Sequence, residues 1–191
     1  MIADASVKSD LRAVLRARRR QLAALYPDAA ERAARGLPST LSAAVVAGYH
    51  AMGAELSPWP VLRRLAKRGA RIVLPVAQQL DAALIFRAWR EGQPLEADAA
   101  GILSPTAEAE ALRPDLVITP LLAFDHSGYR LGQGGGFYDR TLEALRRQGP
   151  VLAIGLAYAG QEVEAVPHEP HDQPLDAILT ESGYHPVRKD N

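Results

Sequence analysis

The stretch 130–142 reads R-L-G-Q-G-G-G-F-Y-D-R-T-L, and the rest of the sequence makes most sense as support for it. Glycines stand at 132, 134, 135 and 136, so backbone can approach a ligand with no Cβ in the way. The apolar and charged residues that follow have helical spacing. A glycine loop that runs into a helix N-terminus presents N–H groups and the positive end of the helix dipole. The stretch therefore predicts an anion site, and phosphate is the anion we expect.

Two common phosphate loops do not match this spacing. A P-loop requires Gly-Lys-Ser/Thr from the fifth position after its first glycine, and that position is Phe137. The dinucleotide fingerprint requires a third glycine at the same place. An ordinary glycine-rich turn remains the alternative on spacing alone. Arg130 and Arg140 on either side, with Asp139 in the first helical turn, favour a ligand site.

The segments around the loop predict alternating strands and helices. The run at 116–122 is apolar on both faces, which is typical of a central strand. The order strand, helix, strand between residues 45 and 74 predicts two parallel strands joined by a right-handed crossover. Residues 84–89 have a strand-like pattern, and we expect them to form an antiparallel strand at the edge of the sheet. Further strands are predicted at 151–156 and 177–180, and helices at 6–25, between Ser57 and Gly69, and at 137–147. We expect an α/β fold over 1–191, a single three-layer domain whose mostly parallel central sheet is flanked by helices. Its topology would be Rossmann-like, as in sugar-phosphate isomerases and CoA transferases.

Composition limits the classes of function. The chain has 191 residues, of which 48% are hydrophobic, enough for one globular core. Lys plus Arg equals Asp plus Glu at 22 each, without the basic excess of a nucleic-acid or anionic-membrane binder. The absence of cysteine excludes disulfides and thiolate chemistry. No apolar run is long enough for a membrane span or a signal peptide, so we expect a cytoplasmic protein, and a monomer by default.

The glycine stretch matches the signature R-L-G-x-G-x-G-[FY]-Y-D at Arg130, Leu131, Gly132, Gly134, Gly136, Phe137, Tyr138 and Asp139. On these residues the chain resembles the 5-formyltetrahydrofolate cyclo-ligase family, the methenyltetrahydrofolate synthetases, and the resemblance runs nearly end to end. It departs at Gly135, where some members carry a basic residue, so other residues would have to meet that phosphate charge. The resemblance implies conversion of 5-formyltetrahydrofolate to 5,10-methenyltetrahydrofolate, with ATP as co-substrate and Mg²⁺ as cofactor.

The resemblance also implies an ATP site that joins the glycine loop to the first helix. Lys8 and Arg12 are four positions apart near the start of that helix and so share one face. The arginines at 16–20 are instead predicted to form a solvated basic face. The implied ATP-binding residues are Lys8, Arg12, Arg130, Leu131, Gly132, Gln133, Gly134, Gly135, Gly136, Phe137 and Tyr138, with Arg130 and Tyr138 as the catalytic pair.

The implied folate site takes Met52, Glu55, Trp89 and Tyr138. A carboxylate at Glu55 can accept two parallel N–H bonds from the pterin, and the alternative is a solvated loop acid. For Trp89, stacking on folate and burial in the core stay open.

The implied Mg²⁺ site takes Asp139 and Asp176, the latter from an H-D-x-x-L-D pattern that begins at His171. We do not expect zinc at the residues 168–172, because prolines prevent a helix that would align the two histidines and no cysteine is available.

Two other functions stay open. One is a different enzyme on the same scaffold, a sugar-phosphate isomerase or a CoA transferase, which would not need ATP. The other is a nucleotide- or folate-binding protein without turnover.

Overall fold

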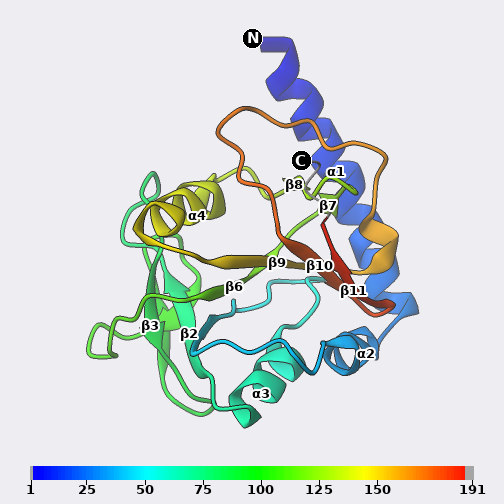
Figure 1. The fold of residues 1–191 in the computed structure, drawn as a ribbon. Coiled ribbons are helices and arrows are strands. Elements are labelled where there is room, and N and C mark those ends of the chain that lie inside the picture. Colours follow the sequence, from blue (N-terminus) through cyan, green and yellow to red (C-terminus); the bar gives the residue numbers. More distant parts are fainter. Residues whose placement is uncertain (1, 188–191) are drawn as a thin grey trace.

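The computed structural model describes residues 2–187, with side chains from Asp10 onward, and it is built on a seven-stranded sheet in the order β11-β10-β9-β6-β1-β2-β3 (Figure 1). The strands are β1 (Val45–Ala47), β2 (Arg71–Val76), β3 (Ile85–Ala88), β6 (Leu116–Pro120), β9 (Leu152–Leu156), β10 (Ala177–Thr180) and β11 (Gly183–Pro186). The five strands from β10 to β2 run parallel, while β11 and β3 are antiparallel at the two edges. The mostly parallel sheet, the central place of the strand at 116–120 and the antiparallel edge strand are confirmed.

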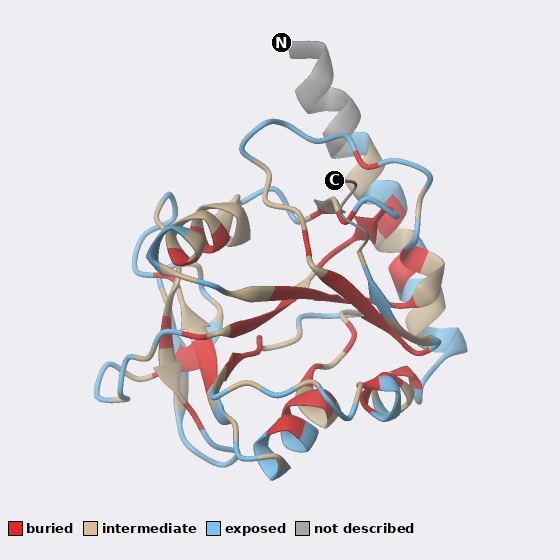
Figure 2. Ribbon diagram, in the orientation of Figure 1, coloured by how far each residue is buried: buried red, intermediate tan, exposed pale blue. Residues whose placement is uncertain are grey.

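Helices cover both faces of this sheet. They are α1 (Ile2–Leu25), α2 (Ala29–Gly36), α3 (Trp59–Lys67) and α4 (Phe137–Gln148), with a 3-10 turn η1 (Ala159–Gln161). In Figure 1, α2 and α3 lie on one face and α4 on the other, which confirms the three layers of a single α/β domain. Leu62 and Leu65 of α3 pack in one buried cluster, and Leu142 and Leu145 of α4 pack in another. Figure 2 shows the central strands buried between these two layers.

Short strands add detail that the sequence did not predict. The long segment after β3, for which the sequence analysis predicted no strand, contains a hairpin of β4 (Leu95–Ala97) and β5 (Leu103–Pro105). The edge strand β11 was also missed. A second hairpin, β7 (Ala123–Phe124) and β8 (Arg130–Leu131), leads from β6 into the glycine loop.

The turn of the second hairpin is held by a buried carboxylate. Asp125 Oδ1 accepts from the backbone N–H of Ser127 and of Tyr129, each at 3.0 Å, and Oδ2 accepts from Val166 N–H at 2.9 Å. These three bonds satisfy amides that a loop would otherwise leave unpaired. The approach of the chain to the glycine loop is therefore fixed by one side chain.

None of the helices within residues 2–187 combines the length and the apolar character needed to cross a lipid bilayer.

Candidate functional site

A cavity of about 1320 Å³ lies where β1, β2 and β6 end. Tyr49 follows β1, Ala77 follows β2 and Leu121 follows β6, and all three line the cavity. The carboxyl edge of a parallel sheet is the usual place for a ligand in an open α/β fold. The volume exceeds the roughly 300–1,000 Å³ of an ordinary small-molecule pocket, so there is room for two substrates.

The glycine loop forms one part of the cavity wall. Gly134 has φ +103° and Gly136 has φ +65°, and Gly136 caps the start of α4 in the left-handed conformation. The left-handed backbone favours glycine at 136, and a Cβ there would lie 2.6 Å from Nη1 of Arg140, so that side chain would have to move. The first amides of α4 therefore open beside the loop, in the arrangement that binds anions at helix N-termini.

Arg140 holds this loop in place. Its Nη2 donates to the carbonyls of Gly135 at 2.8 Å and Leu80 at 3.1 Å, and its Nε donates to that of Ala82 at 3.3 Å. One guanidinium thus ties the glycine loop to the segment after β2. The sequence suggested only a positive charge here, whereas the structure shows a clamp on backbone carbonyls.

Helix α1 packs along the same loop. Arg12 Nε donates to Gly132 O at 3.1 Å, and a Cβ on Gly134 would lie 3.3 Å from the Arg12 guanidinium carbon. Arg16 Nε donates to Gln133 Oε1 at 2.9 Å. The predicted solvated basic face is therefore wrong for Arg16, and Arg12 reaches the loop as expected. Lys8 lies outside the residues whose side chains are described.

Arg130 and Asp139 form an ion pair on the glycine-loop side. Arg130 Nη2 donates to Asp139 Oδ1 at 2.7 Å, and the arginine side chain is only 5% exposed. The Gln173 N–H also donates to Asp139 Oδ1, at 3.0 Å, and Arg130 Nη1 donates to Gln173 O. Burial lowers the pKa of Arg130 while Asp139 opposes that shift. The guanidinium stays charged, because arginine does not lose its proton in proteins.

Glu55 lies on the wall that follows β1, and it is not a solvated acid. Its Oε1 lies 3.3 Å from Arg19 Nη1, and the two side chains are 7% and 8% exposed. Its Oε2 accepts from the Met52 N–H at 3.0 Å. Arg19 is thus a second error in the predicted solvated face.

Tyr138 adjoins both walls. Burial and the nearby Glu55 raise the pKa of its phenol, and Arg130 opposes the shift. The hydroxyl is therefore protonated at neutral pH and available as a hydrogen-bond donor. Met52 and Tyr138 both line the cavity, as the sequence led us to expect.

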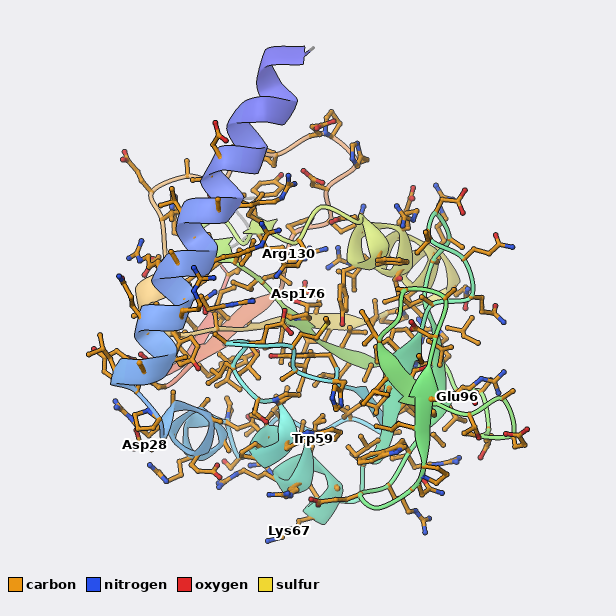
Figure 3. All side chains as sticks on the ribbon, turned by 180° about the vertical axis from the view of Figure 1, so that it is seen from behind. Asp28, Trp59, Lys67, Glu96, Arg130 and Asp176 are labelled. Atoms are coloured by element: carbon orange, nitrogen blue, oxygen red, sulfur yellow. The ribbon has the colours of Figure 1, made fainter. Side chains whose placement is uncertain are left out.

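Trp89 lies elsewhere, in the core. Its ring packs against Trp59 with centroids 4.9 Å apart, and its Nε1 donates to Gln93 O at 3.1 Å. Figure 3 shows Trp59 on α3 below the sheet, whereas Arg130 lies above it. Trp89 is absent from the cavity lining, so the expectation that it contacts folate is corrected in favour of the core.

Asp176 does not meet Asp139. Its Oδ2 accepts from the Ala153 N–H at 2.9 Å and from Arg146 Nη2 at 3.2 Å. Asp176 comes just before β10 and lines a separate, smaller hollow where β6 and β9 begin, whereas Asp139 lines the large cavity where the strands end. The predicted pairing of Asp139 and Asp176 on one Mg²⁺ is therefore corrected.

A different acid, Asp172, lines the cavity with Asp139. It contributes to the charge that acts on Arg130. The signal for it was in the same H-D-x-x-L-D pattern, but spacing does not tell which of two aspartates faces the cavity. Across the described residues, no group of three or more His, Asp or Glu side chains is placed to hold a metal ion.

Comparison with known proteins gives consistent matches. A family model described as the 5-formyltetrahydrofolate cyclo-ligase family matches residues 4–181. The chain is 36% identical over 150 residues to the 5-formyltetrahydrofolate cyclo-ligase of Escherichia coli K12, covering 76% of this chain and 82% of that protein. It is 35% identical over 184 residues to the one of Mycolicibacterium smegmatis, covering 91% and 93%. The solved structure of Aquifex aeolicus 5,10-methenyltetrahydrofolate synthetase is similar with a TM-score of 0.73 at 27% identity, covering 97% of this chain and 95% of that one.

Proposed function

Because the chain belongs to the 5-formyltetrahydrofolate cyclo-ligase family and is an enzyme of that type, we propose that its cavity binds ATP and 5-formyltetrahydrofolate together and joins phosphoryl transfer to ring closure. One observation carries the proposal. A single cavity has an arginine-rich glycine loop in one part of its wall and a buried carboxylate, Glu55, in another. The first suits a polyphosphate and the second suits an array of N–H donors.

The ATP part consists of the glycine loop, the start of α4 and α1. Amides at the helix N-terminus face phosphate oxygens, and the dipole favours their charge. Arg12 and Arg130 line the cavity and supply positive charge, with Lys8 of α1 as the third cation that we propose. Since Gly135 is not basic, these side chains take the place of the basic residue that some members carry there.

The folate part consists of Glu55, Met52 and Tyr138. The Glu55 carboxylate accepts N–H bonds from the pterin, while Met52, which is 51% exposed, offers an apolar surface. Tyr138 lies next to both the glycine loop and the charge of Glu55. We propose that its protonated hydroxyl donates to the transferring group or to the folate at the junction of the two substrates.

The chemistry needs no protein nucleophile. The N5-formyl group is an amide, whose oxygen leaves poorly. That oxygen attacks the γ-phosphorus, and the bond from phosphorus to the ADP oxygen breaks. N10 then attacks the formyl carbon, the C–O bond breaks with release of phosphate, and N10 loses its proton, which leaves the methenyl bridge. The protein's contribution is to align the two substrates and to balance the phosphoryl charge.

Asp139 and Asp172 are the residues that would hold Mg²⁺. Both are carboxylates on the wall of the same cavity, and oxygen ligands of this kind suit the ion, which usually keeps several waters and takes the rest of its ligands from phosphate. When bound, Mg²⁺ would supply positive charge against the phosphate oxygens. Arg130 meanwhile orients Asp139 through the 2.7 Å bond.

The test is a turnover assay on the purified chain. With 5-formyltetrahydrofolate, ATP and Mg²⁺ we expect the near-ultraviolet band of the methenyl product to grow, and to vanish when ATP is omitted. Full turnover in excess EDTA would contradict the Mg²⁺ part alone. Turnover without ATP would favour the isomerase or transferase class, and tight binding without turnover would favour a non-catalytic binding protein. The monomer and the cytoplasmic location stay predictions.

A further inference from the structure

Arg19 occupies an unusual place on α1. The residue is 6% exposed, although its neighbours Arg18 and Arg20 are exposed. Its Nη1 lies 3.3 Å from Glu55 Oε1 and 3.3 Å from the carbonyl of Leu121, at the end of β6. Arg19 is not among the residues that line the cavity, and it reaches the site through two lining residues, the side chain of Glu55 and the backbone carbonyl of Leu121.

One of the hydrogen-bond donors of the Arg19 side chain has no partner. Its Nε is buried and has no hydrogen-bond partner among the described residues. A buried donor without a partner is costly, and replacement of a buried ion pair by apolar side chains is often neutral or stabilising. Fold stability alone is therefore a weak reason for an arginine here. Its charge next to Glu55 is the stronger one.

The groups that face Glu55 explain why that charge matters. The carboxylate pairs with Arg19 of α1, and its charge acts on two tyrosines, Tyr49 just after β1 and Tyr138 of α4. Burial and Glu55 together raise the pKa of both phenols, so neither tyrosine adds charge at neutral pH. Among these facing groups, the cation of Arg19 alone balances the buried carboxylate.

We infer that Arg19 is a positioning residue for the folate, which balances the charge of Glu55 and holds its carboxylate at the cavity wall so that it can accept N–H bonds. The inference rests on the proposed function. It also narrows the ligand class: because the protein itself balances the carboxylate, this wall favours a neutral N–H donor array over a cation. Loss of a merely structural arginine would affect folding, but it would not raise the KM for folate while leaving the KM for ATP unchanged.

The first test compares three variants by steady-state kinetics. Arg19→Gln keeps N–H donors but removes the charge, Arg19→Lys keeps the charge, and Arg20→Gln is the control on the exposed side of the same helix. For Arg19→Gln we expect the KM for 5-formyltetrahydrofolate to rise by about tenfold or more, with the KM for ATP nearly unchanged. Arg19→Lys should recover most of the affinity for folate, because it keeps a cation next to Glu55. Arg20→Gln should match the wild type.

The second test is a double-mutant comparison with Glu55→Gln. If Arg19 acts through Glu55, adding Arg19→Gln to Glu55→Gln raises the folate KM no further. This double variant also removes both buried charges, so it carries the test even if Arg19→Gln alone does not fold.

The outcomes separate the two proposals. An inactive wild type overturns the proposed function and the role of Arg19 with it. An active wild type, with an unchanged folate KM in Arg19→Gln, overturns only the role of Arg19. A double variant with a folate KM well above that of Glu55→Gln also overturns it, because Arg19 would then act independently of Glu55.

Discussion

Two arginine–carboxylate pairs stand on different walls of one cavity, and they differ in contact and exposure. On the glycine-loop wall, Arg130 and Asp139 are 2.7 Å apart and the acid side chain is 25% exposed. On the wall after β1, Arg19 and Glu55 are 3.3 Å apart and both side chains are below a tenth exposed, at 8% and 7%. The first pair is tight and open to solvent on the acid side, while the second is looser and closed.

The difference shows how one cavity can suit two unlike ligands. An acid that remains partly exposed can take a second cation besides its arginine, which fits a wall that handles phosphate and its counter-ion. A buried acid that is paired with its own cation forms a pair without net charge. Such a pair suits a wall that receives flat, neutral N–H donors. Two arginine–carboxylate pairs thus suit different ligands, because one leaves its acid open to a second cation and the other does not.

Asp139→Asn tests the open pair, and we expect the largest effect from it. Loss of one preorganised charge should lower turnover on the order of 10²–10³, and additional Mg²⁺ should recover part of the loss. Because Asn still offers Oδ1 to Arg130, the ligand-free melting temperature should fall by only a few degrees, about 2–4 °C per kcal/mol in a chain of this size. The control is Asp176→Asn, which loses charge next to Arg146 and should lower the melting temperature with turnover intact. Equal turnover in the two variants would contradict the assignment of Asp139.

Glu55→Gln tests the closed pair. Gln replaces one acceptor with a donor, so the pterin loses a charged hydrogen bond worth roughly 1.5–3 kcal/mol, or about 10- to 150-fold in folate affinity. The affinity for ATP should stay near that of the wild type. The melting temperature should drop as well, since Arg19 is left without its carboxylate. Unchanged folate affinity, measured by titration calorimetry, would make Glu55 a bystander.

Gly136→Ala probes the loop wall itself. Alanine in the left-handed conformation costs about 1–2 kcal/mol, and its Cβ would collide with Arg140. We expect the KM for ATP to rise by up to roughly tenfold, with the folate KM little changed. Gly132→Ala is the matched control for folding, because its φ is not positive and a Cβ there meets nothing within 4 Å. It should melt like the wild type, and an equal loss of stability in both variants would show that backbone strain is not the cause.

Trp89→Phe tests whether Trp89 lies outside the folate site, and it should have the smallest effect on catalysis. The variant loses the Nε1 hydrogen bond to Gln93 O and part of the contact with Trp59, which should cost about 1 kcal/mol of stability or somewhat more. Both KM values should remain within about twofold, well under the tenfold that 1.4 kcal/mol represents. A marked rise in the folate KM would return Trp89 to the folate site.

Much of the fold followed from local sequence patterns. The parallel strands are apolar runs with clear breaks, and the glycine stretch correctly predicted a helix that starts at Phe137. The strand β11 was not predicted because its residues, G-Y-H-P, combine glycine and proline with little apolar character. The β4–β5 hairpin was not predicted because each of its strands has only three residues, too few to show an alternating pattern.

The site was less predictable where partners are distant in the sequence. In the sequence Arg19 resembles its neighbouring arginines, and its partners Glu55 and Leu121 lie 36 and 102 positions away. A signal did exist, since Arg19 comes four residues after Leu15 and three before Leu22, and thus falls on the apolar stripe of α1. Asp172 and Asp176 could not be told apart in the same way, because a loop has no periodicity that assigns faces.

The docking of α1 against residues far along the chain has a consequence during synthesis. Helix α1 leaves the ribosome early, yet Leu121 and Gly132, which it contacts, follow 102 and 120 positions after their partners. At 5–20 residues per second, α1 waits roughly 5–25 s before these partners have been made. During that interval its leucine stripe has nothing to cover it, while its many arginines keep it hydrated. Chaperone binding to nascent chains should therefore peak at this stage and end once the glycine loop has emerged.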